Sequence, residues 1–167
     1  GNAGDDLLEG GAGADSIVGG AGIDSARYEY STVGVTVDLA AGTGLAGHAQ
    51  GDVLSGIENL YGSNYNDSLI GDAGANSLGA DTLEGDGGTD TADYSASAAA
   101  VAVSLTTGTG VGGDAQGDVL SQIENITGSV NNDSLTGNSS ANVLDGAAGN
   151  DSLIGGGGNE TPTRGGR

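Results

Sequence analysis

The sequence predicts an all-β protein folded as a flattened, right-handed solenoid. Three observations favour this fold: the composition, a nine-residue repeat and a 66-residue repeat. The chain has 167 residues, of which 36 are glycine, and it contains no Phe, Trp, Met or Cys. With neither large apolar aromatics nor disulfides, the core has to be built from Leu, Ile, Val and Ala in many thin layers stacked by repetition.

The nine-residue repeat defines the strands and the turns. Residues 1–9, 10–18 and 19–27 share a Gly-rich loop, an acid at the sixth position and an apolar residue two positions later. Three-residue segments between six-residue loops are too short for helices, and they fit minimal strands whose middle side chain points inward. Two strands and two loops make one coil, so we expect residues 18 apart to lie on the same edge.

The 66-residue repeat adds two spacers to this pattern. Residues 81–144 repeat 15–78 without a gap, so the spacer 28–57 corresponds to 94–123. Near the start of each spacer, 33–39 and 99–105 alternate with period two, which predicts a longer strand in a wider coil of the same sheet. Tyr28 and Tyr94 correspond in the two copies, and we expect them to pack over the coil edges.

We expect one solenoid module, in which repeats occupy 1–27, 58–93 and 124–160 and the spacers occupy 28–57 and 94–123. The stretch 75–81 is four residues shorter than 141–151, which predicts a shortened turn near Gly79 and leaves the register of Asp81 open. Proline cannot donate to a strand ladder, so the array is expected to end at Pro162 and to leave 161–167 as a frayed tail.

The charge of the chain restricts the classes of partner that it can bind. The formal net charge is −20, from 23 acidic and 3 basic residues. This excess disfavours nucleic acid and anionic membranes as partners. No apolar run of 18 residues is present to span a membrane. The acids indicate either a disordered acidic chain or one whose carboxylates are neutralised by cations, and their positions decide between the two.

The acids stand where calcium ligands would stand. Calcium prefers six to eight oxygen ligands at about 2.3–2.6 Å, from carboxylates and backbone carbonyls. Each Gly-rich loop offers carbonyls, its closing Asp adds a carboxylate, and the loop of the next coil lies about 4.8 Å away. By the 18-residue spacing, the best same-edge pairs are Asp6 with Asp24 and Asp133 with Asp151.

Residues 10–18 and 19–24 follow the pattern G-G-x-G-x-D-x-U-x, and loops 85–90, 146–151 and 155–160 follow it with substitutions. This pattern resembles the RTX (repeats-in-toxin, hemolysin-type) calcium-binding repeats. The resemblance implies a parallel β-roll with several calcium ions between coils, type I secretion, and folding outside the cell or at the bacterial surface.

The implied metal-binding set consists of loop-closing residues and loop glycines. Its members are Asp6, Asp15, Asp24, Asp67, Asp90, Asp133, Asp151, Asn76, Asn142, Gly11, Gly13, Gly20, Gly22 and Gly149. The two asparagines carry no charge, so their sites should be weaker. Glu58, Glu124 and Glu160 have a longer side chain and either ligate differently or do not ligate.

The function expected from these features is structural and calcium-dependent rather than enzymatic. A second candidate is a cell-surface adhesin, filament or surface-layer repeat that associates with itself end to end. A polysaccharide-active enzyme is less favoured, because the sequence offers no cluster of Lys, Arg or His for proton abstraction. Ice binding is disfavoured because the outward strand positions hold no regular row of threonines, and a glycan stacked on Tyr61 or Tyr65 is a minor alternative.

Overall fold

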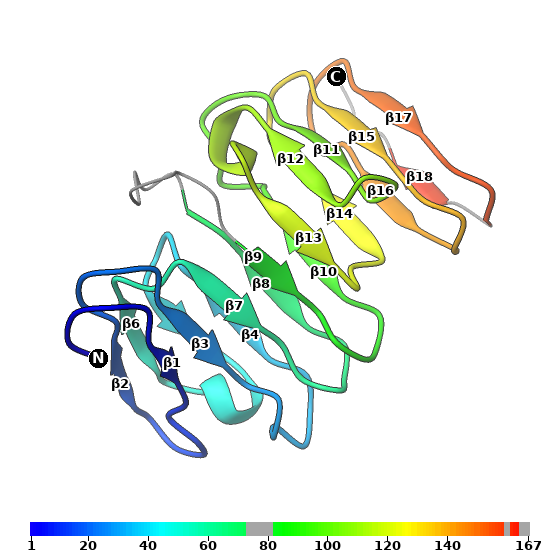
Figure 1. Ribbon diagram of the computed structural model, residues 1–167. Helices are drawn as coiled ribbons and strands as arrows, with labels where there is room; N and C mark the ends of the chain where they lie inside the picture. Colours follow the sequence, from blue (N-terminus) through cyan, green and yellow to red (C-terminus); the bar gives the residue numbers. More distant parts are fainter. Residues whose placement is uncertain (73–81, 159–160, 164–167) are drawn as a thin grey trace.

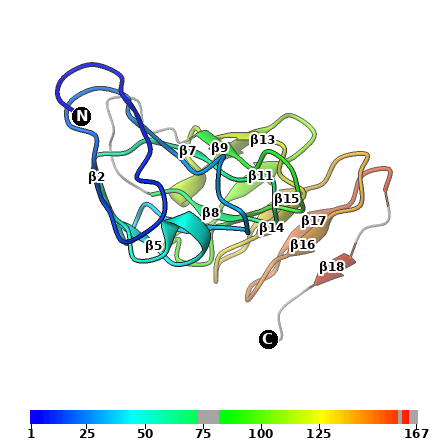
Figure 2. The ribbon, with the colours of Figure 1, turned by 90° about the horizontal axis from the view of Figure 1, so that it is seen from below.

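The protein is all-β apart from two single-turn 3-10 helices, in a computed structural model that describes residues 1–72, 82–158 and 161–163. Within these residues, 18 short strands form two nine-stranded sheets. The strands are stacked along one long direction from the N-terminus to the C-terminus (Figure 1). Seen from below, the two sheets form two layers (Figure 2).

The chain passes from one sheet to the other after each repeat. The first sheet runs in the order β1 (Leu7–Leu8), β3 (Ser25–Arg27), β7 (Asn59–Tyr61), β9 (Thr82–Glu84), β13 (Val119–Ser121), β12 (Thr109–Val111), β11 (Ala102–Ser104), β15 (Ser134–Thr136) and β17 (Ser152–Ile154). The second runs in the order β18 (Thr161–Thr163), β16 (Val143–Asp145), β14 (Asn125–Thr127), β10 (Thr91–Asp93), β8 (Ser68–Ile70), β4 (Thr36–Asp38), β5 (Thr43–Gly44), β6 (Val53–Ser55) and β2 (Ser16–Val18). The helices are η1 (Gly47–Ala49) and η2 (Gly113–Ala115).

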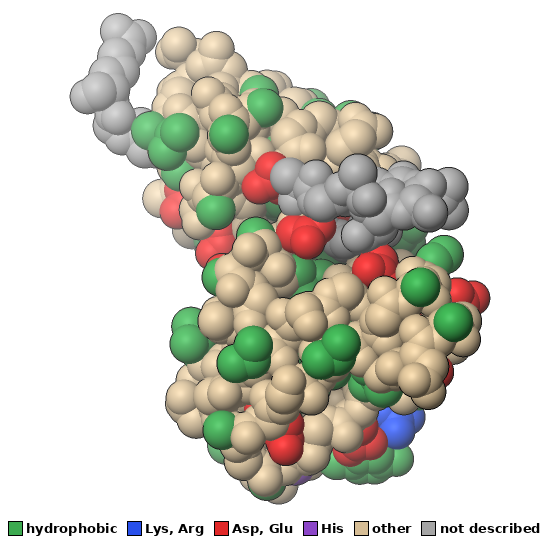
Figure 3. All heavy atoms as spheres, turned by 90° about the vertical axis from the view of Figure 1, so that its left-hand side faces the viewer, with side chains coloured by type: hydrophobic (Ala, Val, Ile, Leu, Met, Phe, Trp, Pro, Cys, Tyr) green, Lys and Arg blue, Asp and Glu red, His purple; other side chains and the backbone are tan. Residues whose placement is uncertain are grey.

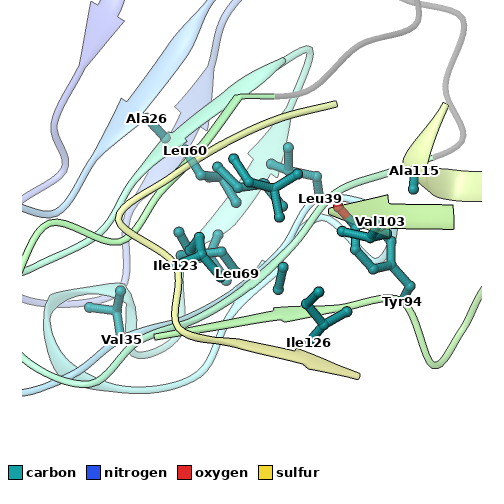
Figure 4. Close-up of a cluster of buried hydrophobic side chains, with 14 of the residues drawn as sticks. Ala26, Val35, Leu39, Leu60, Leu69, Tyr94, Val103, Ala115, Ile123 and Ile126 are labelled. Atoms are coloured by element: carbon teal, nitrogen blue, oxygen red, sulfur yellow. The ribbon is translucent and has the colours of Figure 1, made fainter. Parts of the chain in front are cut away.

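The predicted strand geometry of the repeats is confirmed. Strands 18 residues apart pair in parallel, as Leu7 with Ser25 and Ser134 with Ser152. The middle residue of most strands is buried and its neighbours are at least partly exposed. The core between the sheets is therefore a stack of thin aliphatic layers, in which Leu60, Leu69, Leu83 and Leu135 are fully buried. Leu60 and Leu69 are labelled in the close-up of this core (Figure 4).

The prediction of one long strand in each spacer is wrong. Over 33–39 the regular strand is only β4, because the Val35 N–H donates to the Asp67 carboxylate and the Asp38 side chain accepts the Ala41 N–H in a turn. The chain then returns as β5 and β6, each antiparallel to the strand before it. The second spacer repeats this arrangement with β11, β12 and β13, so the sheets are mixed rather than wholly parallel.

The two 66-residue copies occupy opposite sheets. Strands β4, β5 and β6 belong to the second sheet, whereas their counterparts β11, β12 and β13 belong to the first. From β2 to its counterpart β9, the chain changes sheet five times. Because five is an odd number, the second copy starts in the other sheet, and its spacer adds strands to that sheet. Both sheets therefore have nine strands.

Two predictions about single residues need correction. Tyr28 and Tyr94 do not pack over the coil edges: they are 1% and 2% exposed and lie in the core, because carboxylates inside the fold accept their hydroxyls. The array does not end before Pro162, which lies in β18 opposite Leu144. A proline is tolerated there because β18 is an edge strand.

Some predictions fall on residues outside the described ranges. These are the shortened turn near Gly79, the register of Asp81 and the site at Asn76. Within the described ranges, no helix has the length and apolar character needed to cross a membrane.

Candidate metal centre

The loop-closing acids form hydrogen-bonded ladders along the two edges where the chain passes between the sheets. Asp24 Oδ1 accepts the Asp6 N–H at 2.8 Å, and Asp151 Oδ1 accepts the Asp133 N–H at 3.0 Å. The two predicted same-edge pairs are therefore direct neighbours. Asp90 Oδ1 accepts the Asp67 N–H at 2.7 Å in the same way, although this pair is 23 residues apart.

Among the loops that the structure describes in full, four have a closed conformation, in which the closing side chain accepts the N–H of the loop's own second residue. Ser129 donates to Asp133 Oδ2 at 2.7 Å, and Asn138 donates to Asn142 Oδ1 at 2.8 Å. The closed loops are 1–6, 62–67, 128–133 and 137–142. In two of them a serine hydroxyl, from Ser63 or Ser129, also donates to the closing Asp, so these carboxylates are satisfied within their own loop.

Four other loops have an open conformation, in which the second residue has a positive φ. The open loops are 10–15, 19–24, 85–90 and 146–151, with φ of 93° at Gly11, 123° at Gly20, 69° at Asp86 and 50° at Ala147. In these loops one oxygen of the closing Asp is buried and has no hydrogen-bond partner; the four oxygens are Oδ2 of Asp15, Asp24, Asp90 and Asp151. Ala147 holds this conformation without being glycine, at a cost of about 1–2 kcal/mol, and Asp86 holds it at a smaller cost because aspartate tolerates the left-handed region better.

A buried, unpartnered carboxylate oxygen is expensive unless a cation compensates it. Asp90 shows the effect, because its pKa is raised from 3.8 to about 6. Burial is the largest cause, and the neighbouring charges of Asp67, Glu124 and Asp86 add to it. The hydrogen bond from the Asp67 N–H lowers the pKa in the opposite direction. Burial likewise raises the pKa of Asp67, which its hydrogen bonds from Val35 and Ser63 oppose. The open loops thus contain carboxylates that are incompletely satisfied by the protein alone.

Backbone oxygens would have to complete any cation site. In the described part of the chain, no three His, Cys, Asp or Glu side chains gather closely enough to hold a metal by themselves. The loops do bring carbonyls together, because a Cβ on Gly22 would overlap the Gly4 carbonyl and one on Gly149 would overlap the Asn131 carbonyl. Carboxylates and carbonyls are the donors that calcium prefers, so the residues present fit calcium.

The predicted site residues divide among these two kinds of loop. Asp15, Asp24, Asp90 and Asp151 close open loops, whereas Asp6, Asp67, Asp133 and Asn142 close closed loops. The five predicted glycines all have positive φ, namely Gly11, Gly13, Gly20, Gly22 and Gly149. Asn142 Nδ2 donates to the Glu124 carbonyl at 2.8 Å, so its amide is satisfied on both atoms.

The family model of the RTX calcium-binding nonapeptide repeat matches four stretches of the chain, over residues 1–26, 52–78, 77–96 and 127–161. These stretches cover more than half of the sequence. The chain belongs to the RTX calcium-binding nonapeptide-repeat family. A comparison with curated proteins gives no match. The RTX repeats identify the protein as a calcium-binding β-roll module of the bacterial type, in agreement with its all-β fold.

Three acids outside the RTX loops, namely Glu58, Glu124 and Asp52, also contact them. Glu58 Oε2 accepts the Asp24 N–H at 2.6 Å, and Glu124 Oε2 accepts the Asp90 N–H at 3.0 Å. Asp52 accepts the Asp15 N–H at 2.9 Å and the Tyr28 hydroxyl at 3.0 Å. In the second copy Asp118 accepts the Tyr94 hydroxyl at 2.8 Å.

A signal for these acids was available in the 66-residue repeat. Tyr28 and Tyr94 stand at equivalent positions of the two copies, and so do Asp52 and Asp118. Each copy therefore contains one phenol donor and one carboxylate acceptor at the same spacing.

Proposed function

We propose that the chain is a single right-handed β-roll module of a larger secreted bacterial protein, and that it folds when it binds several calcium ions outside the cell. The observation that supports this most directly is the set of four buried, unpartnered Asp oxygens in the open loops. Calcium would supply these carboxylates with the positive charge that the protein lacks, since the sequence has 3 basic residues against 23 acids.

Each proposed RTX site combines an open loop with the closed loop before it on the same edge. Within the described residues, three such pairs occur: 1–6 with 19–24, 62–67 with 85–90, and 128–133 with 146–151. In each pair the open loop offers the carboxylate, from Asp24, Asp90 or Asp151, and both loops offer carbonyls. The closed loop, whose carboxylate already accepts hydrogen bonds, holds the coil in register.

The energy of binding is large enough to decide whether the chain folds. Extracellular calcium modules have dissociation constants of about 10⁻⁴ to 10⁻³ M. At ten times the dissociation constant, one site stabilises the folded state by about 1.4 kcal/mol. Several sites together approach the total stability of a small domain, about 5–15 kcal/mol. The chain would therefore remain unfolded in low-calcium cytosol and fold in millimolar calcium.

The module is proposed to be structural rather than catalytic. Arg27, the one basic residue other than His48 within the described ranges, is bound to Glu9 at 3.0 Å and to Glu29 at 3.5 Å. The alternatives of an end-to-end surface assembly and of a polysaccharide-active enzyme gain no specific observation in their favour.

Isothermal titration calorimetry of calcium into the whole chain tests the proposal. Asp24→Asn keeps an oxygen that can accept the Asp6 N–H but removes the charge, so it should weaken at least one ion by at least about tenfold. Asp93→Asn is the matched control, because Asp93 lies in strand β10 rather than in a loop and its acceptor role toward the Ser95 N–H is kept. No calcium binding by the unaltered chain, or equal binding by both variants, would refute the proposal.

A further inference from the structure

Each spacer ends in a turn that replaces a nonapeptide loop. After β6 the turn is Gly56-Ile57-Glu58, and after β13 it is Gln122-Ile123-Glu124. These turns stack directly on open loops, since the Gly19 N–H donates to the Ser55 carbonyl at 3.0 Å and the Gly85 N–H donates to the Ser121 carbonyl at 3.1 Å. Each turn has three residues where a nonapeptide loop has six.

The shortened turn keeps an acid in the edge ladder by using a longer side chain. Glu58 Oε2 accepts the Asp24 N–H, which is the same bond that Asp24 Oδ1 makes to the N–H of Asp6. Glu124 Oε2 does the same for the Asp90 N–H. The additional methylene of glutamate lets the carboxylate reach the ladder from the shorter turn, which accounts for Glu at a position where every six-residue loop except 155–160 has Asp or Asn.

Oxygens from the turn and from the open loop converge on one point. A Cβ on Gly19 would lie 2.6 Å from Asp24 Oδ2 and would overlap the carbonyl oxygen of Gly56. In the second copy, a Cβ on Gly85 would lie 2.6 Å from Asp90 Oδ2 and would overlap the carbonyl oxygen of Gln122. Asp24 and Asp90 are both 0% exposed, and these Oδ2 atoms have no hydrogen-bond partner.

The charge at this junction also calls for a cation. Asp24 and Glu58 are 0% and 7% exposed, and the Glu58 carboxylate accepts the Asp24 N–H. Arg27 is bound to Glu9 and Glu29. A cavity of about 180 Å³ lies beside Glu58 and is lined partly by Ser55, Gly56 and Asp72, so an ion has a polar approach from solvent.

We propose that each spacer ends in a calcium site of its own, formed by Gly56, Glu58 and Asp24 in the first copy and by Gln122, Glu124 and Asp90 in the second. The inference rests on the proposed function and extends it to sites in which one partner is a spacer. Gln122 and Glu124 lie within 97–126, outside every stretch that the RTX family model matches. The spacers are then not passive interruptions, because they complete the cation sites of the open loops on which they stack.

Glu58→Gln, Glu124→Gln and the double variant isolate the charge. Glutamine keeps an oxygen that can accept the Asp N–H, so the stacking contact is retained. Calorimetric titration with calcium should show one ion lost, or weakened by at least about tenfold, in each single variant and two in the double variant. Glu29→Gln is the control, since Glu29 carries the same charge, lies beside Arg27 at 3.5 Å, and follows β3 at the opposite end of that strand from loop 19–24.

The outcomes separate this inference from the proposed function. Wild-type stoichiometry and affinities in the double variant would overturn the junction sites, while an unaltered chain that binds no calcium would overturn the function itself. If the double variant does not fold in saturating calcium, terbium-substituted crystals of the unaltered chain decide the matter. Anomalous density between Asp24 and Glu58 supports the inference, and density confined to pairs of nonapeptide loops refutes it.

Discussion

At the scale of single residues, the second position of each loop divides acids that look equivalent in sequence. Where that residue is Ser63 or Ser129, its N–H and hydroxyl occupy the closing carboxylate. Where it has positive φ, the closing Asp keeps a buried oxygen without a partner. The closing acids were predictable from the nine-residue spacing, but this division was not, because Ala147 adopts a conformation that alanine disfavours and Asp86 one that aspartate adopts only in a minority of cases.

Ala147→Gly tests whether the open conformation carries strain. Ala147 has a φ of 50°, which glycine adopts without the steric penalty of a Cβ. We expect the calcium-bound variant to be more stable by about 0.5–1 kcal/mol, measured by urea unfolding. Ala148→Gly should destabilise or have no effect, because Ala148 has no positive φ. Equal destabilisation by the two changes would contradict the strained loop.

The raised pKa of Asp90 predicts opposite pH responses with and without calcium. Because burial raises this pKa from 3.8 to about 6, the folded state binds the proton more tightly than the unfolded state. The resulting stabilisation is full below about pH 4 and is lost as the pH rises through about 6. In EDTA, lowering the pH from about 7 to about 5 should therefore raise the β-content and the thermal midpoint.

With calcium present, lowering the pH should instead lower the stability of the fold, since protons compete with the ion for the same carboxylate. Circular dichroism at several pH values with EDTA and with calcium measures both trends. Asp90→Asn should weaken the pH dependence of the β-content and of the thermal midpoint in EDTA. If the β-content and the thermal midpoint changed with pH in the same direction in both buffers, Asp90 and its neighbours would not bind calcium.

At the scale of elements, buried tyrosine–aspartate pairs attach the spacers to the repeats. The Tyr28 hydroxyl donates to Asp52 Oδ2, and Asp52 Oδ1 accepts the N–H of Asp15. One carboxylate thus connects the start of the spacer, its returning strand and the preceding open loop. Burial and then the charge of Asp52 raise the pKa of Tyr28, so the phenol remains a donor at all pH values where the fold persists.

Tyr28→Phe should destabilise the calcium-bound fold by about 1–3 kcal/mol, because it preserves the shape of the ring but leaves Asp52 with an unsatisfied buried oxygen. Tyr94→Phe should cost a similar amount through Asp118. Tyr65→Phe is the control, because Tyr65 is 47% exposed. Chemical denaturation in calcium measures all three, and a loss at Tyr28 no larger than that at Tyr65 would contradict the role of the pair.

The strands of the repeats were predictable and those of the spacers were not, for a physical reason. In the repeats, the apolar residue two positions after each Asp fixes both the strand and the face it buries, as at Leu69 and Leu135. In the spacers, period-two alternation over 33–39 indicates extended backbone but does not specify where pairing stops or in which direction the next strand runs. The Asp38 turn and the Asp67 side chain decide that, and Asp67 lies 28 or more residues further along the chain.

At the scale of the whole molecule, an odd number of sheet changes per 66 residues distributes the spacers evenly between the two sheets. Each spacer adds three strands to one sheet, and the second copy restores the balance that the first disturbs. The same arrangement places the two junction turns on opposite edges, since Glu58 leads from the second sheet to the first and Glu124 leads from the first to the second.

The distribution of charge gives this architecture its dependence on a cation. With a net charge of −20, the stacked coils bring like charges into register along the edges. Red acidic side chains recur on the face shown in Figure 3, where the single blue patch is Arg27 among the residues that the structure describes. Hydrophobic layers only one residue deep must hold these edges together, so neutralisation by bound ions is expected to decide the stability of the fold.

A calcium titration of the whole chain, followed by far-ultraviolet circular dichroism from an EDTA-containing start, tests this most directly. The calcium-folding account predicts a disordered spectrum in EDTA and a cooperative rise of the β-signal as calcium reaches about the millimolar range. A β-spectrum in EDTA at neutral pH that is identical to the spectrum in calcium would contradict it.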